Sequence, residues 1–138
     1  MRDTLSKIAK IHEKGSKFIE SELKNNGIKG LVTSHGDILA VLYAYGEMTM
    51  KDIADKIHRT RPTVTVLVNK LEKNGYVTRK VSPQDNRFTY IELTPQGEKF
   101  KPIFEKISTD LNNLLGKNLT KEEIDILDKL LEKILMTD

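Results

Sequence analysis

The sequence predicts a mainly α-helical domain that contains one small β-hairpin. Three observations support this fold class. Apolar residues recur every three or four positions along most of the chain, and helix-capping residues precede several of these segments. One further segment instead alternates between apolar and polar residues, as strands do. With 138 residues, 38% of them hydrophobic and 31% charged, the chain is long enough for a single domain, 1–138, with its own core.

Two helices are expected in the N-terminal third. Apolar residues at helical spacing predict a helix from about Leu5 to Asn25, and the segment NNGIKG, 25–30, ends it with residues that tolerate a left-handed backbone. Ser34 is then predicted to cap a second helix, with Asp37 three residues later. The apolar run 38–45 makes this second helix a buried one, because its alanines favour helix over strand.

The next two helices have helix-turn-helix spacing. Thr49 is predicted to cap a short helix with Asp52 at its third position, and Thr60 a longer one that closes at Asn74. Pro62 is tolerated in the first turn, where its nitrogen would lack an intrahelical partner anyway. A turn of three to four residues separates the two helices, which is the arrangement of helix-turn-helix units.

A hairpin and two more helices complete the predicted order. Residues 76–81 and 88–93 alternate and are rich in β-forming side chains, which predicts two strands joined by a six-residue turn. Thr94 is predicted to cap a long helix that ends at Gly116, and Thr120 begins the last one with a capping box. The apolar faces of the first and last helices are wide enough to need a partner.

Positive charge is concentrated in the middle of the chain. The net charge is only +3, so the protein is not a polycation. Between His58 and Tyr90, however, seven basic residues face only two acidic ones, whereas acids outnumber bases from Lys101 to Asp138. The electropositive part therefore coincides with the predicted helix-turn-helix and hairpin.

The helix from Thr60 to Asn74 is the predicted reading helix for a DNA major groove. Short side chains in its first turn allow close approach to the groove, where threonine methyls and arginine can meet base edges. An ordinary surface helix pair with the same spacing is the alternative. The predicted DNA-contacting residues of this region are Thr60, Arg61, Pro62, Thr63, Thr65, Val66, Asn69 and Lys70, with Arg79 on the following strand.

The hairpin turn adds a second predicted contact with DNA. Arg87 lies at its tip, and an arginine there fits a minor groove where the groove is narrow and its potential most negative. Asp85, two residues earlier, is positioned to hold the guanidinium in a bidentate pair, and Pro83 stiffens the loop. The alternative is a solvated turn with an incidental ion pair.

The hairpin and the helix start after it carry a family pattern. Asp85, Arg87, Leu93, Thr94 and Gly97 fit D-x-R-x5-L-T-x2-G, and a helix-turn-helix precedes them. In this pattern and in its helix order, essentially the whole chain resembles the multiple antibiotic resistance regulator (MarR) family.

The resemblance implies a winged helix-turn-helix repressor that is an obligate homodimer. Residues 34–100 would form the DNA-binding lobe, and residues 1–30 and 101–138 the helical dimerisation lobe. It implies a pseudo-palindromic operator as the DNA partner, and it further implies small aromatic or phenolic effectors that bind between the two lobes. His35 and Tyr43 are the candidate effector-binding residues, and Tyr45 is a possible neighbour.

Three other function classes are alternatives for this sequence. A zinc-responsive regulator of the same fold is the nearest, but His12, His35 and His58 are scattered and the chain has no cysteine, so no metal ligands are assigned. An enzyme is disfavoured because no catalytic constellation or phosphate-binding loop is visible, and no cofactor is expected. A winged-helix protein-interaction module would not need the excess of positive charge.

The compartment follows from two further features. The N-terminus is charged and amphipathic, unlike a signal peptide, and the longest apolar run, 38–45, is far shorter than the roughly 20 residues of a membrane span. The sequence therefore predicts a soluble, cytoplasmic protein.

Overall fold

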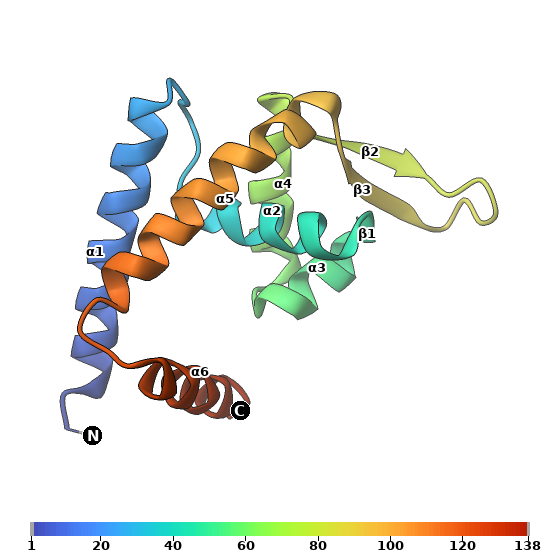
Figure 1. Cartoon of the computed structure of the whole chain (residues 1–138). Helices are drawn as coiled ribbons and strands as arrows, with labels where there is room; N and C mark the ends of the chain where they lie inside the picture. Colours follow the sequence, from blue (N-terminus) through green and yellow to red (C-terminus); the bar gives the residue numbers. More distant parts are fainter. Residues whose placement is uncertain (1, 138) are drawn as a thin grey trace.

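The computed structural model describes residues 2–137, which form six α-helices and a small antiparallel sheet. Helices α2, α3 and α4 gather beside the sheet, from which strands β2 and β3 project outward (Figure 1). Helices α1 and α5 lie side by side, and α6 crosses below them. The elements are α1 (Thr4–Asn25), α2 (Thr33–Tyr45), β1 (Met48–Thr49), α3 (Met50–Ile57), α4 (Arg61–Lys73), β2 (Val77–Val81), β3 (Thr89–Leu93), α5 (Pro95–Leu115) and α6 (Lys121–Leu135).

The core lies between α2, α3, α4 and the sheet. Ile38 and Leu42 of α2, Ile53 of α3, Val68 of α4 and Ile91 of β3 are all almost fully buried. Burial of each such side chain contributes about 1.5–3 kcal/mol to the fold. This packing uses one face of α4, so the opposite face of that helix points outward on a rigid base.

The sheet has the strand order β1-β3-β2, with both pairs antiparallel. Val77 pairs with Leu93 and Val81 with Thr89, which confirms the predicted hairpin, although each strand begins one residue later than expected. Strand β1 was not predicted: it has only two residues, too few to show an alternating pattern. Its pairing with β3 joins the hairpin to the start of α3.

Four threonines cap helices as predicted. The side-chain oxygens of Thr49, Thr60, Thr94 and Thr120 each accept a hydrogen bond from the backbone N–H three residues later. Thr120 also forms the full capping box with Glu123. Each cap satisfies a backbone donor that would otherwise lack a partner at the helix start.

The predicted Ser34 cap with Asp37 is wrong. Helix α2 begins two residues earlier than that cap implies, at Thr33, with Val32 in the capping position. The N–H of Val32 donates to Nδ1 of His35 at 2.9 Å, and the N–H of His35 donates to the Val32 carbonyl at 3.0 Å. The imidazole therefore takes the place that the Glu123 carboxylate has at α6, where it accepts the N–H of the capping residue Thr120.

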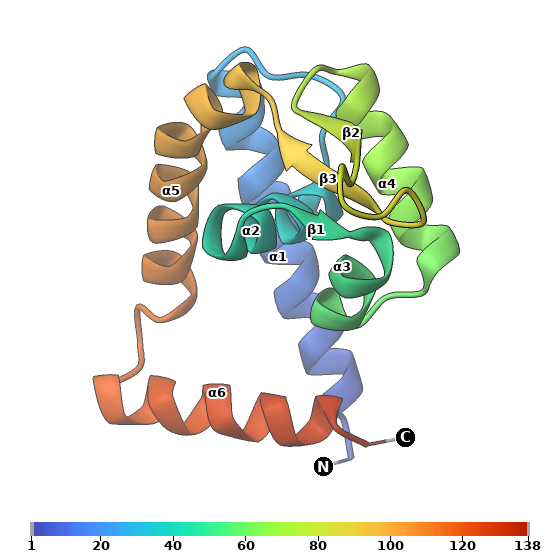
Figure 2. The same ribbon diagram turned by 90° about the vertical axis from the view of Figure 1, so that its right-hand side faces the viewer.

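Helix α6 stands apart from the lobe that contains α2, α3 and α4 (Figure 2). None of its residues is buried, even though seven of its fifteen residues are isoleucine or leucine. Side chains on the first half of α1 are exposed as well, including Leu5 and Ile11. The apolar faces predicted at both chain ends are thus open to solvent in the single chain.

Candidate nucleic-acid interface

The turn between α3 and α4 holds the two helices in helix-turn-helix geometry. Helix α3 ends at Ile57 and is followed by the capping residue His58, whose backbone is left-handed with φ of 58°. The N–H of Arg59 donates to the Ala54 carbonyl at 3.1 Å. The Thr60 hydroxyl donates to Oγ1 of Thr63 at 3.0 Å and accepts the N–H of Thr63 at 3.4 Å. The entry to α4 is therefore held by local hydrogen bonds, as the sequence predicted.

Helix α4 presents a largely uncovered outer face. Arg61, Pro62 and Thr63 are exposed, and Val66 is 68% exposed although it is apolar. Thr65 is half-buried, and its hydroxyl donates to the Arg61 carbonyl at 2.9 Å. No other part of residues 2–137 covers this first turn and a half, so the surface is free to meet another molecule.

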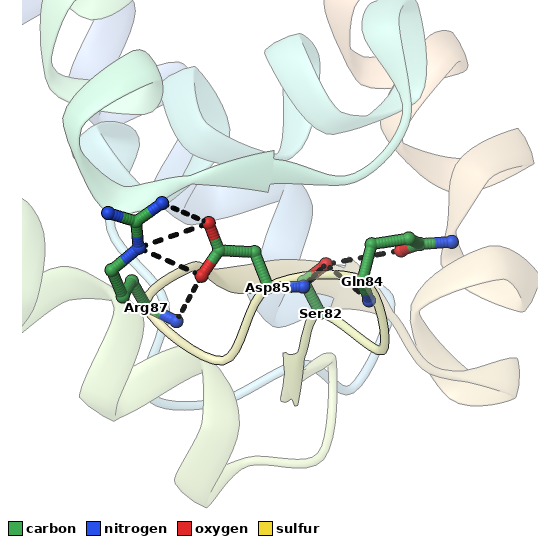
Figure 3. Close-up of polar contacts among 4 residues, drawn as sticks. All are labelled: Ser82, Gln84, Asp85 and Arg87. Carbon is green, nitrogen blue, oxygen red and sulfur yellow. Dashed lines mark hydrogen bonds and ion pairs between the residues drawn. The ribbon is translucent and has the colours of Figure 1, made fainter.

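The hairpin tip shows the predicted pairing of Asp85 with Arg87 (Figure 3). The Arg87 Nε donates to both carboxylate oxygens of Asp85 at 3.0 and 3.1 Å, and Nη2 donates to Oδ2 at 2.6 Å. The Arg87 guanidinium lowers the pKa of Asp85, and the carboxylate raises the pKa of Arg87, so both groups stay charged. The Arg87 side chain is still 81% exposed.

Ser82 fixes the other side of the same loop. It is buried by the loop, and its Oγ accepts the N–H groups of Gln84 and Asp85, both at 3.3 Å. The N–H of Ser82 donates to the Phe88 carbonyl at 2.9 Å. Ser82 was not predicted as part of the site, although a serine before proline is a common turn signal.

Arg79 and Asn69 are both predicted contacts, and the structure brings them together. Nη2 of Arg79 donates to Oδ1 of Asn69 at 2.6 Å, and Nη1 donates to Oε1 of Glu72 at 3.0 Å. Glu72 was missed by the sequence reasoning. Its signal was its position three residues after Asn69, which places both on one side of α4.

Lys70 points away from Asn69. A Cβ built on Gly30 would lie 3.4 Å from its Cε and 3.9 Å from its Nζ, so the lysine reaches over the loop between α1 and α2. Among the described residues, neither Arg61, Lys70 nor Lys73 forms an ion pair. Their charge is therefore available to a polyanion near α4.

The structure separates the two candidate effector residues. His35 lines a cavity of about 60 Å³ between α1, α2 and α5, together with apolar side chains that include Leu23, Phe100 and Phe104. Tyr43 lines a different hollow on the other side of α5, and its hydroxyl donates to the Gly97 carbonyl at 2.6 Å. In the single chain the two side chains thus line different hollows, and their effector-binding role, with Tyr45 as a possible neighbour, stays a prediction.

The environments of these two side chains also differ. Burial lowers the pKa of His35, and the positive charge of Lys70 lowers it further, so the imidazole is neutral near pH 7. Burial also raises the pKa of the Tyr43 hydroxyl, which keeps it protonated and able to donate. Within residues 2–137, no group of three histidine or acidic side chains is arranged to hold a metal ion.

A helix pair joined by a tight turn and followed by a projecting hairpin defines a winged helix-turn-helix protein. We refer to α4 as the reading helix and to residues 77–93 as the wing. None of the helices between residues 2 and 137 is long and apolar enough to cross a lipid bilayer.

Comparisons with known proteins agree with this class. The family model for the MarR family matches residues 33–89. The HTH-type transcriptional regulator MhqR of Bacillus subtilis is 28% identical over 76% of this chain and 72% of its own length. An uncharacterized HTH-type transcriptional regulator of Bacillus cereus is 30% identical over 83% of this chain and 78% of its own. The chain belongs to the MarR family, as its motif indicated.

Solved structures confirm the predicted fold class. A MarR transcriptional regulator from Methanosarcina mazei superposes with a TM-score of 0.81 at 20% identity, covering 97% of this chain and 95% of that one. A cysteine-to-serine mutant of MarR from E. coli, complexed with operator DNA, superposes with a TM-score of 0.78 at 22% identity, covering 93% and 90%. At these identities the likeness establishes the fold.

Proposed function

We propose that the protein is a homodimeric, sequence-specific DNA-binding repressor in the cytoplasm, and not an enzyme. The observation that carries this proposal is the pairing of an uncovered reading helix with a wing whose tip arginine is both exposed and held in place. Arg87 keeps its guanidinium 81% exposed while Asp85 fixes its direction. Such pre-organisation lowers the entropy lost when the arginine enters a minor groove.

The reading helix would enter a major groove by its N-terminal half. Arg61, Thr63 and Val66 are the exposed side chains that would reach base edges there. Two such helices in a dimer fit half-sites about 34 Å apart, which favours a pseudo-palindromic operator. Each wing would then lie over the flanking minor groove.

The dimer is proposed from the apolar surface that the single chain leaves open. Leu127, Leu130 and Ile134 of α6 are 43%, 51% and 44% exposed, and Leu5 of α1 is 80% exposed. Helix spacing places the three α6 side chains on one face. A monomer rarely leaves such a continuous apolar face in water, and a second copy that covers it with the same face closes a two-fold dimer.

Release by a small aromatic or phenolic molecule is the second part of the proposal. The cavity at His35 has an almost wholly apolar lining, with that neutral imidazole as a polar group. Its volume of about 60 Å³ is less than half of the roughly 150 Å³ that accommodates benzene in a protein interior. A ligand would therefore have to move α1 and α5 from α2, and this shift would alter the spacing of the two reading helices.

Fluorescence anisotropy tests the proposal directly. The purified protein would be titrated against the DNA upstream of its own gene and against a scrambled duplex, at low and near-physiological salt. We expect a preference of about 10³-fold or more for the native fragment, with one dimer per site. Equal and weak binding to both duplexes would contradict sequence-specific recognition of that fragment, and no binding at low salt would favour a winged-helix protein-interaction module.

The same titration distinguishes a zinc-responsive regulator of the same fold. Addition of zinc or of a chelator should leave the affinity for DNA unchanged if no metal is involved. A zinc-dependent change in affinity would contradict the assignment of a metal-free regulator.

A further inference from the structure

Arg79 connects the wing to the reading helix through two hydrogen bonds. It lies on β2, and its guanidinium reaches Asn69 at 2.6 Å and Glu72 at 3.0 Å, both on α4. Asn69 is seven residues after Pro62 and three after Val66, so it lies on the same exposed face of the reading helix. An asparagine on that face can contact a base edge only with the atoms that Arg79 leaves free.

The chemistry of the pair fixes which end of the Asn69 amide is occupied. A guanidinium has only N–H donors, so its partner must be the amide oxygen and not the amide nitrogen. Oδ1 of Asn69 is thus held toward Arg79, and Nδ2 points elsewhere with no hydrogen bond to any residue between 2 and 137. Asn69 consequently presents two free N–H donors, while the guanidinium of Arg79 lies against its only acceptor atom.

Glu72 keeps Arg79 in this position. The Glu72 carboxylate pairs with Nη1 of Arg79, while Nη2 of Arg79 donates to Asn69. Both terminal nitrogens of the planar guanidinium therefore have partners. Both charged side chains are about one-third exposed, and such a pair contributes little to stability in water. The pair instead fixes the direction of the Arg79 guanidinium, and the attraction between the two charges strengthens when DNA excludes water from the same surface.

We propose that Arg79 is a positioning residue that makes Asn69 a donor-only reader and so sets its base preference. The inference rests on the proposed function. Asparagine usually selects adenine by accepting from N6–H with its oxygen while donating to N7. Arg79 uses one of the two lone pairs of that oxygen, and its positive charge disfavours the approach of the adenine N6–H₂ donor to the other. Guanine offers two acceptors, O6 and N7, to the same N–H groups.

The test is a binding-site selection from a randomised duplex library, sequenced for the wild-type dimer and for variants. The wild type should favour guanine over adenine at one position in each half-site, and Asn69→Ala should abolish the preference there. Arg79→Met keeps the aliphatic stem but frees the amide oxygen. We expect the guanine-to-adenine ratio at that position to fall by about fivefold or more, the lower end of what a bidentate base contact contributes.

Two further variants separate positioning from general effects. Glu72→Gln loosens the hold on Arg79 and should shift the same ratio in the same direction by less. Lys80→Met removes a positive charge from the next residue of β2, which points to the other side of the strand, and should leave that ratio unchanged. Thermal unfolding of each variant checks that its fold is retained.

The outcomes are distinct. If the wild type selects no consensus, the proposed function fails and the inference fails with it. If a consensus appears but Arg79→Met keeps the ratio at every position, Arg79 does not direct Asn69 and the inference alone is wrong. A uniform loss of affinity on all sequences, with a smaller salt dependence, would make Arg79 a phosphate contact and would equally overturn the inference.

Discussion

At the scale of single residues, the wing tip shows how an exposed ion pair can matter without stabilising the fold. Arg87 and Asp85 are both at the surface, where such a pair adds little to folding. The same contacts fix the direction of a long, flexible side chain before DNA arrives. Selection for DNA affinity is therefore a better physical explanation of the pair than selection for stability.

Replacement of Arg87 tests this explanation. Arg87→Ala should weaken DNA binding, most strongly on operators with A·T-rich flanks, because those have the narrow minor groove that attracts arginine. Arg87→Lys is the matched control: it keeps the charge and the salt dependence but loses the fork that Asp85 orients. Anisotropy on operators with A·T-rich and G·C-rich flanks measures both. Unchanged affinity for Arg87→Ala would exclude the wing contact.

Position 97 requires glycine because a larger side chain would clash with its neighbours, and not because of its backbone conformation. A Cβ at this position would overlap the carbonyl oxygen of Tyr76, in the backbone that leads into β2. The Gly97 carbonyl also accepts the Tyr43 hydroxyl, so the start of α5 is held between the wing and α2. The glycine of the family pattern therefore allows the wing base and α5 to approach closely.

Gly97→Ala should consequently lower the free energy of unfolding by about 1–3 kcal/mol or more, because backbone must move to admit the methyl group. Gly15→Ala in helix α1 is the control, since a Cβ there would meet only Leu111 of α5, at an ordinary 3.5 Å. There the alanine should stabilise the helix by up to about 1 kcal/mol. Urea unfolding of both variants measures the difference. Equal effects would contradict the steric argument.

At the scale of elements, the start of α2 depends on the protonation state of one side chain. The Val32 N–H donates to Nδ1 of His35, and this requires an unprotonated Nδ1. Burial and the charge of Lys70 lower the pKa of His35 in the folded state. The unfolded chain therefore binds this proton more readily than the folded one does.

The sign of the pH effect follows. The contribution of His35 to stability is fully present above the ordinary pKa of about 6.5, and is lost as the pH falls through the interval down to the lower folded pKa. His35→Gln should lose less stability than the wild type between about pH 7.5 and about pH 5.5 in urea unfolding. Burial raises the pKa of Asp37, so Asp37 makes stability depend on pH in the opposite direction. This contribution is the same in the wild type and in His35→Gln. Parallel curves for the two proteins would contradict this role of His35.

The sequence predicted elements that depend on local chemistry and missed those that depend on distant partners. The caps at Thr49 and Thr60 were predictable because a threonine oxygen needs only the N–H three residues later. The α2 start was not, because an imidazole is an unusual capping group. The contact between Arg79 and Asn69 spans ten residues and two elements, so no spacing rule reveals it.

At the scale of the whole molecule, the open apolar face of α6 is the feature that a single chain does not explain. Its isoleucines and leucines lie on one side, and acidic residues and lysines on the other. Leu130→Glu places a charge near the centre of the apolar side and should shift the protein from dimer to monomer. Lys129→Glu introduces the same residue on the polar side and should not.

Light scattering of the two variants after gel filtration measures their mass, and anisotropy measures their affinity for DNA. Loss of the dimer should also remove high-affinity operator binding, because one reading helix would then bind one half-site. A dimeric Leu130→Glu variant would show that α6 does not form the central contact.

The central claim is that two reading helices and two wings bind one operator together. Hydroxyl-radical footprinting of the protein on its upstream DNA tests this claim most directly. We predict a two-fold symmetric pattern, with protected backbone around two major grooves one helical turn apart and a further protected minor groove on each outer side. A single protected groove, or uniform protection without symmetry, would contradict it.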